Sequence, residues 1–180
     1  MLPHTTPPRA AERQPSVLLI GDSMGEGLEP HLRTLFGARN YITRWKRGTT
    51  TKYWTAQDVA RTIRLANPDV VIFALGTNDA HQRKTPQESA INARQLIQAA
   101  GGRTVLWAGQ PDSPRIQDYG TAKAIAEAVI GTGGRYFDTK ELALRFYDGI
   151  HPYPDSFKTW GKALYGCVRN LIASPAPARG

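Results

Sequence analysis

The strongest constraint on the fold is the alternation of short, unbroken apolar runs with segments of helical periodicity. The most apolar runs are residues 17–20 (VLLI) and 70–75 (VVIFAL). Both have the length of a buried strand, whereas a membrane-spanning helix needs roughly 20 apolar residues. Strands buried on both faces are typical of parallel sheets covered by helices. The sequence therefore predicts an α/β fold: a single-domain three-layer α/β/α sandwich with a doubly wound, five-stranded parallel sheet in the flavodoxin-like strand order.

Turn and capping residues place the boundaries of these elements. The expected strands are residues 16–21, 40–45, 69–75, 103–108 and 135–138. Thr55 and Thr85 are expected to cap helices that end at residues 66 and 100, and Thr85 is followed by proline and, three residues on, by Glu88. Two further helices are expected over residues 119–130 and 156–172. Pro30 is expected to limit where the first helix, which ends at residue 36, can begin.

The chain is expected to form one domain with two proline-rich tails. A length of 180 residues suits a single hydrophobic core. The tails are residues 1–15 and 174–180, and the domain is residues 16–173. The N-terminal tail lacks the apolar run of a signal peptide, which makes the cytoplasm the default expectation for the sequence as given. Both tails are candidates for binding a larger assembly.

Charge and cysteine content narrow the partners and the chemistry. The chain has 23 Lys and Arg against 15 Asp and Glu, a formal charge of +8. This excess favours anionic partners such as nucleic acid, acidic glycans or membrane surfaces, without choosing among them. The single cysteine, Cys167, excludes an internal disulfide and a metal site built from cysteines.

Polar residues with catalytic potential follow three of the predicted strands. Ser23 lies in a Gly-rich turn after the first strand, where it could cap the next helix or act as a nucleophile. Asn78 follows the third strand. Asp148 and His151 follow the fifth strand and are three residues apart, a spacing that lets the carboxylate orient the imidazole. Because ligands bind at the carboxyl ends of parallel strands, these side chains are expected to converge.

These segments together resemble the SGNH, or GDSL-type, hydrolase family. The matching blocks, in the family's order, are Gly21-Asp22-Ser23, Gly48, Gly76-Thr77-Asn78-Asp79 and Asp148-Gly149-Ile150-His151. Met24 stands where the family has leucine. Gly48 is a single glycine and so is not a motif by itself.

The resemblance implies an acyl-enzyme mechanism that needs no metal or organic cofactor. It makes Ser23 the nucleophile, His151 the base and Asp148 the residue that orients the imidazole. The oxyanion would be held by the backbone N–H groups of Ser23 and Gly48 and by the Asn78 amide. Asp22 and Asp79 are expected to tie loops together through backbone hydrogen bonds.

Candidate substrate-binding residues lie beside these blocks. The cluster around the second strand combines cations and aromatic rings that suit an anionic or carbohydrate substrate, although such runs are usually solvated faces. His81 is expected at the rim of the site, and Tyr147 and Tyr153 are expected to wall the pocket or to pack under the loop. The candidates are Arg44, Trp45, Lys46, His81, Tyr147 and Tyr153.

The leading function is a serine esterase acting on a short acyl group, acetyl first, carried by a small molecule or a glycan. The absence of a long apolar lid from the sequence favours this over a lipid acyl hydrolase or a thioesterase. A non-catalytic binding module for an anionic polymer such as RNA is the alternative that the basic charge favours. A flavodoxin-like or receiver-type domain would leave Asp148 and His151 unexplained.

Overall fold

The computed structural model describes residues 14–173 and contains one five-stranded sheet with all its strand pairs parallel. The strand order is β2-β1-β3-β4-β5, which confirms the predicted doubly wound topology. The predicted tail residues 1–13 and 174–180 lie outside the described part of the chain. No described helix is long and apolar enough to cross a membrane.

Burial separates the central strands from the edge strands. Every residue of β1 (Val17–Gly21) and β3 (Val70–Ala74) is buried, as expected for strands covered by helices on both faces. β4 (Thr104–Ala108) is buried except at its first residue. The edge strands β2 (Tyr41–Trp45) and β5 (Arg135–Phe137) are less buried, and each combines exposed with half-buried residues.

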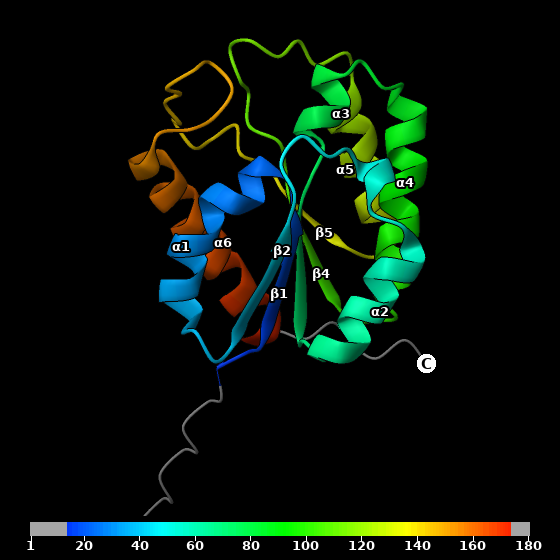
Figure 1. Ribbon diagram of the computed structural model, residues 1–180, viewed down its shortest axis with the longest axis vertical. Coiled ribbons are helices and arrows are strands. Elements are labelled where there is room, and N and C mark those ends of the chain that lie inside the picture. The colour runs from blue at the N-terminus through cyan, green and yellow to red at the C-terminus, as the bar shows by residue number, and fades with distance from the viewer. Residues whose placement is uncertain (1–13, 174–180) are drawn as a thin grey trace, which may run out of the picture.

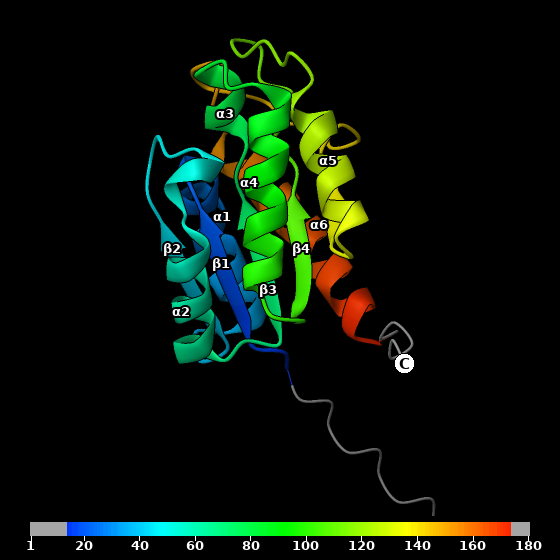
Figure 2. The same ribbon diagram turned by 90° about the vertical axis from the view of Figure 1, so that its right-hand side faces the viewer.

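Helices cover both faces of the sheet (Figure 1). α1 (Ser23–Phe36) and α6 (Pro154–Ala173) pack together on one face, over a core that includes Leu28, Leu32 and Trp160. α2 (Ala56–Ala66), α4 (Pro86–Ala99) and α5 (Thr121–Gly131) cover the other face. Figure 2 looks onto this second layer, with α4 in front of the sheet.

The capping predictions are confirmed, and Pro30 behaves differently from the expectation. Thr55 and Thr85 accept hydrogen bonds from the backbone N–H groups of Asp58 and Glu88. Pro30 does not limit the start of α1, which begins seven residues earlier and contains the proline. Pro30 lies on the exposed side of α1, where its ring does not have to fit into the core.

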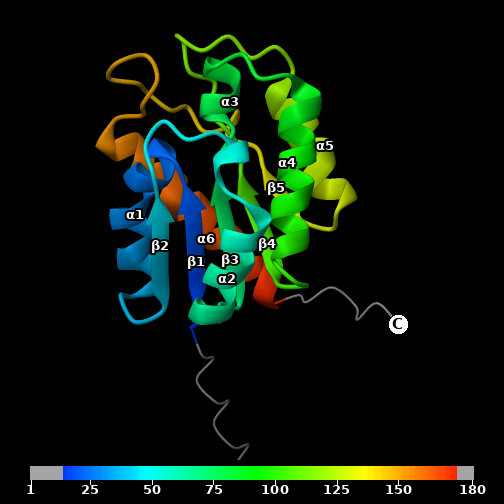
Figure 3. The same ribbon diagram turned by 45° about the vertical axis from the view of Figure 1, so that its right-hand side comes forward.

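Two short helices were not anticipated. They are the 3-10 helix η1 (Thr51–Tyr53) and α3 (Thr77–His81), one following β2 and the other following β3. Neither is long enough to show helical periodicity in the sequence. Figure 3 shows α3 and the long loops gathered at the carboxyl end of the sheet. The polar residues singled out by the sequence follow the strands and therefore lie at this end.

Candidate active site

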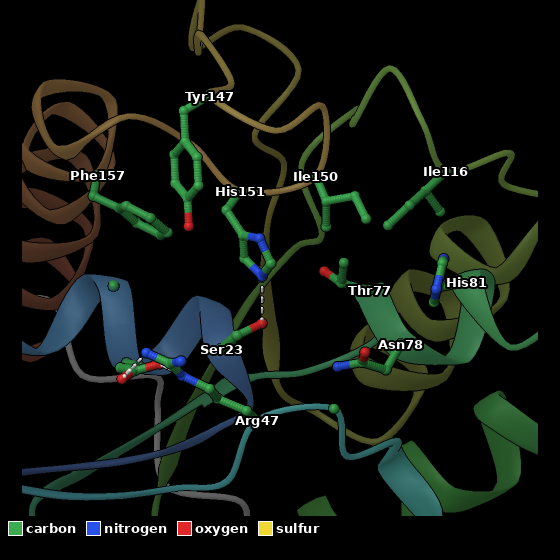
Figure 4. A pocket seen from close by; sticks show the side chains of 13 residues that line it. Ser23, Arg47, Thr77, Asn78, His81, Ile116, Tyr147, Ile150, His151 and Phe157 are labelled. Atoms are coloured by element: carbon green, nitrogen blue, oxygen red, sulfur yellow. Dashed lines mark hydrogen bonds and ion pairs between the residues drawn. The ribbon is translucent and has the colours of Figure 1, made fainter.

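A tight turn at the end of β1 places Ser23 at the start of α1. Gly21 makes this turn possible, because a Cβ there would lie 2.9 Å from the Cα of Gly25 and 3.1 Å from the carbonyl oxygen of Ala74. Asp22 is the N-cap of α1 and accepts from the Met24 N–H at 2.8 Å. Ser23 is therefore the first helical residue rather than the cap, and its side chain is left to face the cavity (Figure 4).

A chain of hydrogen bonds links Ser23 to the loop between β5 and α6. The Nε2 atom of His151 lies 3.0 Å from the Ser23 Oγ (Figure 4). The Nδ1 atom of His151 lies 2.7 Å from Oδ2 of Asp148. With the proton on Nδ1 donated to the carboxylate, Nε2 is free to accept the serine hydroxyl proton. The arrangement can therefore turn the hydroxyl into a nucleophile.

The carboxylate of Asp148 is fixed by its own loop. Its Oδ1 accepts from the backbone N–H groups of Ile150 at 2.8 Å and His151 at 2.7 Å. Burial raises the pKa of Asp148, but the hydrogen bonds from the His151 backbone, the imidazole and the Ile150 backbone outweigh burial and lower the pKa to about 2. Asp148 is thus ionised at neutral pH, and its Oδ2 can accept the hydrogen bond from Nδ1 of His151.

Asn78 reaches the same place from α3. It lies in the first turn of this helix, after Gly76, whose φ of 120° is disfavoured for residues with a side chain. Its Nδ2 donates to Oδ2 of Asp22 at 2.8 Å. Asp22 is fully buried, and this burial raises its pKa to about 7, although the hydrogen bonds from Met24 and Asn78 lower it. As expected, Asp22 accepts a backbone hydrogen bond; it also orients the Asn78 amide.

Asp22→Asn is expected to remove a pH dependence of stability. The pKa of this carboxyl rises from its ordinary value of 3.8, which holds in the unfolded chain, to about 7 in the folded protein. Between these values the folded state holds a proton that the unfolded state has released. The free energy of unfolding therefore falls as the pH rises through this window, by up to about 1.4 kcal/mol per pH unit. Urea unfolding of the wild type and of Asp22→Asn at about pH 5 and about pH 7 measures this change in the free energy of unfolding. An equal fall in the variant would assign the effect to another group.

Asp79 fastens the loop that carries Gly48. Its carboxylate accepts from the Thr51 N–H at 2.8 Å, the Thr51 hydroxyl at 2.6 Å and the Ser89 hydroxyl at 3.0 Å. Burial raises the pKa of Asp79, although the hydrogen bonds from Thr51 and Ser89 lower it. Gly48 has a φ of 73°, and its carbonyl accepts from Gln82 at 3.1 Å. The expected loop-tying role of Asp79 is seen in the contacts with Thr51.

The hydrogen-bonded residues open into a cavity of about 390 Å³. Figure 4 shows Phe157 and Tyr147 to one side of the Ser23–His151 pair, and Ile116, Thr77 and His81 to the other side. The complete lining is Ser23, Glu26, Gly27, Arg47, Gly48, Thr77, Asn78, His81, Ile116, Tyr147, Ile150, His151 and Phe157. A cavity of this size lies toward the small end of the range for ligand sites.

The substrate-binding candidates divide between two places. His81 and Tyr147 line the cavity. The Tyr147 ring stacks on the His151 ring, with 5.9 Å between the ring centroids. Tyr153 lies outside this lining, against Tyr147. Arg44, Trp45 and Lys46 line a separate depression at the β2 edge of the sheet. The structure thus places these three residues beside the cavity rather than in it.

Three of the lining residues, Glu26, Gly27 and Ile116, were not among the predicted candidates for the site. Arg47 also lines the cavity, and it belongs to the predicted cluster of cations and aromatic rings around the second strand. Arg47 and Glu26 form an ion pair at the cavity rim. Gly27 lies under Phe157, because a Cβ at this position would fall 2.2 Å from the phenylalanine ring. Ile116 comes from the loop after β4, which has no recognisable motif. Glu26 and Gly27 lie within four residues of Ser23 in the sequence. Ile116 reaches the cavity only through the fold, so no local signal could have identified it.

Comparisons with known proteins identify a family and a shared fold. The GDSL-like Lipase/Acylhydrolase family model matches residues 19–159. Among solved structures, a GDSL-like lipase from Bacteroides thetaiotaomicron is 14% identical, with a TM-score of 0.71, 89% of this chain covered and 91% of the other. No match is found among the curated proteins.

Two further solved structures have the same fold. The C-terminal catalytic domain of Streptococcus pneumoniae peptidoglycan O-acetyltransferase A is 13% identical, with a TM-score of 0.69, and the comparison covers 92% of this chain and 98% of that domain. A Clostridium thermocellum family 3 carbohydrate esterase is 16% identical, with a TM-score of 0.63 and coverages of 89% and 98%. At these identities the similarity shows the fold alone.

Proposed function

The chain belongs to the GDSL-like lipase/acylhydrolase family of ester-hydrolysing enzymes, and on this premise we propose that it is a serine esterase in which Ser23, His151 and Asp148 form the catalytic triad. The observation that carries the proposal is the unbroken hydrogen-bond chain from the Ser23 hydroxyl through His151 to the Asp148 carboxylate. Both distances lie within the range that proton transfer requires.

The reaction follows from this chain of contacts. The Ser23 Oγ attacks the ester carbonyl carbon while its proton passes to Nε2 of His151, and the carbonyl becomes an oxyanion. When this intermediate collapses, the bond to the alcohol oxygen breaks and His151 returns the proton to the leaving alcohol. Water, activated by the same imidazole, then releases the acid from the acyl-enzyme. Asp148 holds the imidazole orientation and stabilises its cationic form.

Three donors at the carboxyl ends of β1, β2 and β3 suit the oxyanion. They are the backbone N–H groups of Ser23 and Gly48 and the side-chain amide of Asn78. Asn78 and Gly48 both line the cavity beside Ser23. The hydrogen bond to Asp22 holds the Asn78 amide in advance of the reaction, and donors that are already oriented stabilise a transition state without reorganisation cost.

Asn78→Ala is expected to lower kcat by about a hundredfold or more with little change in KM. The reason is that the amide meets a negatively charged oxygen only as the reaction proceeds, so its loss affects the transition state more than the bound ester. Steady-state kinetics on p-nitrophenyl acetate measures the effect. A kcat near that of the wild type would remove Asn78 from the oxyanion hole.

The shape of the cavity favours a short acyl group. Phe157 and Tyr147 bound one side, and Ile116 and Ile150 line the other, in a cavity of about 390 Å³. Exposed rings and cations at the β2 edge, among them Trp45 and Lys46, would suit a carbohydrate next to the site. An acetyl ester carried by a glycan is therefore the proposed substrate. This proposal is compatible with the similarity in fold to the carbohydrate esterase and to the peptidoglycan O-acetyltransferase domain.

Two alternatives differ in what they require of Ser23. A lipid acyl hydrolase or thioesterase would use the same triad with a longer acyl chain, as the similarity to a GDSL-like lipase allows. A non-catalytic module for an anionic polymer such as RNA is favoured only by the charge of +8. Such a module would have no need for His151 to lie 3.0 Å from the Ser23 hydroxyl.

Hydrolysis of p-nitrophenyl esters of increasing chain length tests the proposal, with Ser23→Ala as the control. Turnover that depends on Ser23 and is highest on acetate supports the short-acyl esterase. A preference for long chains would favour a lipid substrate. Absence of any Ser23-dependent turnover, together with tight RNA binding, would favour the binding module.

A further inference from the structure

The loop that carries Asp148 and His151 belongs to no helix or strand. Its ends are held by short-range contacts: the Tyr147 N–H donates to the His151 carbonyl at 3.1 Å, and the Tyr153 N–H donates to the Arg145 carbonyl at 2.8 Å. The turn at residues 148–151 depends on the Asp148 carboxylate, which accepts hydrogen bonds from the backbone N–H groups of Ile150 and His151. These contacts close the loop on itself, and contacts with another segment must fix its position relative to Ser23.

Residues 113–116, which we name the strap, supply hydrogen bonds of this kind. The strap lies in the segment between β4 and α5. This segment and the loop that carries Asp148 and His151, here called the catalytic loop, both lie at the carboxyl end of the sheet (Figure 1). The Arg115 Nη1 donates to the Asp148 carbonyl at 3.2 Å, and the Arg115 backbone N–H donates to the Gly149 carbonyl at 3.0 Å. The Ser113 hydroxyl donates to the Ile150 carbonyl at 2.9 Å. Three consecutive carbonyls before His151 are thus bound by two residues of the strap.

Packing fits the two segments to each other. Gly149 has a φ of 80°, and a Cβ at this position would lie 2.5 Å from both Cγ and Cδ of Arg115. The aliphatic part of the arginine therefore occupies the space that any other residue at position 149 would need. Ser113 is 5% exposed, so its hydroxyl makes its hydrogen bond away from competing water.

Resting on the proposed function, we infer that Ser113 and Arg115 are positioning residues that hold His151 in register with Ser23. The strap touches neither the Ser23 hydroxyl nor the imidazole, and it acts through the backbone of the catalytic loop. A displacement of about 1 Å in a reacting group can cost about a hundredfold in rate. The alignment of two residues 128 positions apart in the chain thus depends on the strap as well as on the sheet.

The strap also reaches the cavity. Ile116, from the strap, and Ile150, from the catalytic loop, both line the cavity (Figure 4). A role confined to substrate binding would pass through Ile116 and would change KM. A positioning role passes through Ser113 and Arg115 and changes kcat. The two roles therefore differ in which kinetic constant moves.

The kinetic test compares Arg115→Ala, Ser113→Ala and Arg115→Lys with the wild type on p-nitrophenyl acetate. The two alanine variants are expected to lower kcat about tenfold each with KM changed less than about twofold. Arg115→Lys keeps a cationic donor on a long aliphatic chain and is expected to recover most of the loss. Gln117→Ala, an exposed residue of the same loop, is the matched control and should retain wild-type kinetics. Unchanged kcat in both alanine variants, or a change in KM alone, would overturn the inference.

A second readout does not depend on ester hydrolysis. The proton between Nδ1 of His151 and Asp148 should give a low-field resonance in the proton NMR spectrum that His151→Ala removes. In Arg115→Ala and Ser113→Ala this resonance is expected to broaden through faster exchange with water, while Gln117→Ala leaves it sharp. A sharp resonance in both strap variants would overturn the positioning role.

The two readouts also separate this inference from the proposed function. If the wild type showed the resonance but hydrolysed no ester, the proposed function would fail, while the NMR comparison would still test the role of the strap. Ser113→Ala, the smallest of these changes, covers the case in which an Arg115 variant does not fold.

Discussion

Ser23→Ala is expected to lower kcat for ester hydrolysis by about 10⁵- to 10⁶-fold. Without the hydroxyl no acyl-enzyme can form, and the oxyanion donors and His151 can only assist direct attack by water. The effect should be close to the full contribution of the triad, because the three residues act as one unit. Steady-state kinetics on p-nitrophenyl acetate, measured at high enzyme concentration, can follow so large a loss.

The fold should survive this substitution. Asp22, not Ser23, is the N-cap of α1, and alanine is favourable at a helical position. The thermal unfolding midpoint is therefore expected to stay near that of the wild type. Labelling with a phosphonate ester gives a second check: the wild type should gain the mass of one adduct, and the variant should gain none. A variant that kept more than about one per cent of kcat would show that Ser23 is not the nucleophile.

Much of the fold was predictable because each central element carries a local signal. The apolar runs of β1 and β3 are long enough to identify fully buried strands, and Thr55 and Thr85 mark helix starts through their caps. Pro30 gave a wrong expectation, since local rules treat proline as a helix breaker. The packing of α1 against α6 and the sheet overrides that preference.

The central part of the site was predictable for a related reason. Ser23 and Asn78 each follow a buried strand closely, and Asp148 and His151 are close enough in sequence to meet within one loop. Parallel strands then bring the three segments to one edge of the sheet. The predicted positions of these side chains needed only a parallel sheet, which the alternation of apolar runs and helical segments predicts.

The surroundings of the site could not be predicted in this way. Arg44 and Trp45 are neighbours in sequence, but adjacent side chains of a strand point to opposite faces. Arg44 therefore contacts Thr62 of α2, whereas Trp45 donates to Glu29 of α1. Treating them as one cluster ignored this alternation. The contact between Ser113 and Ile150 joins two loops without periodicity, so it exists only in the folded chain.

Asp148→Asn is expected to lower kcat by about 10⁴-fold while the protein stays folded. The carboxylate uses Oδ1 to accept from the backbone N–H groups of Ile150 and His151, and Oδ2 to accept from Nδ1 of His151. Asparagine has one oxygen. If this oxygen keeps the two backbone hydrogen bonds, the new NH₂ group faces Nδ1, which must then accept a hydrogen bond. The imidazole proton moves to Nε2, where it prevents His151 from accepting the proton of Ser23.

Comparison with Asp148→Ala separates orientation of the imidazole from folding of the loop. Alanine loses the backbone hydrogen bonds as well, so it is expected to lower both kcat and the thermal unfolding midpoint. Asparagine should lower kcat alone, because it preserves the turn. The burst of p-nitrophenol should also slow in the asparagine variant, since the affected step is the attack by Ser23. If Asp148→Asn kept kcat within about tenfold of the wild type, the carboxylate would serve the loop and not the imidazole, and the proposed triad would reduce to Ser23 and His151.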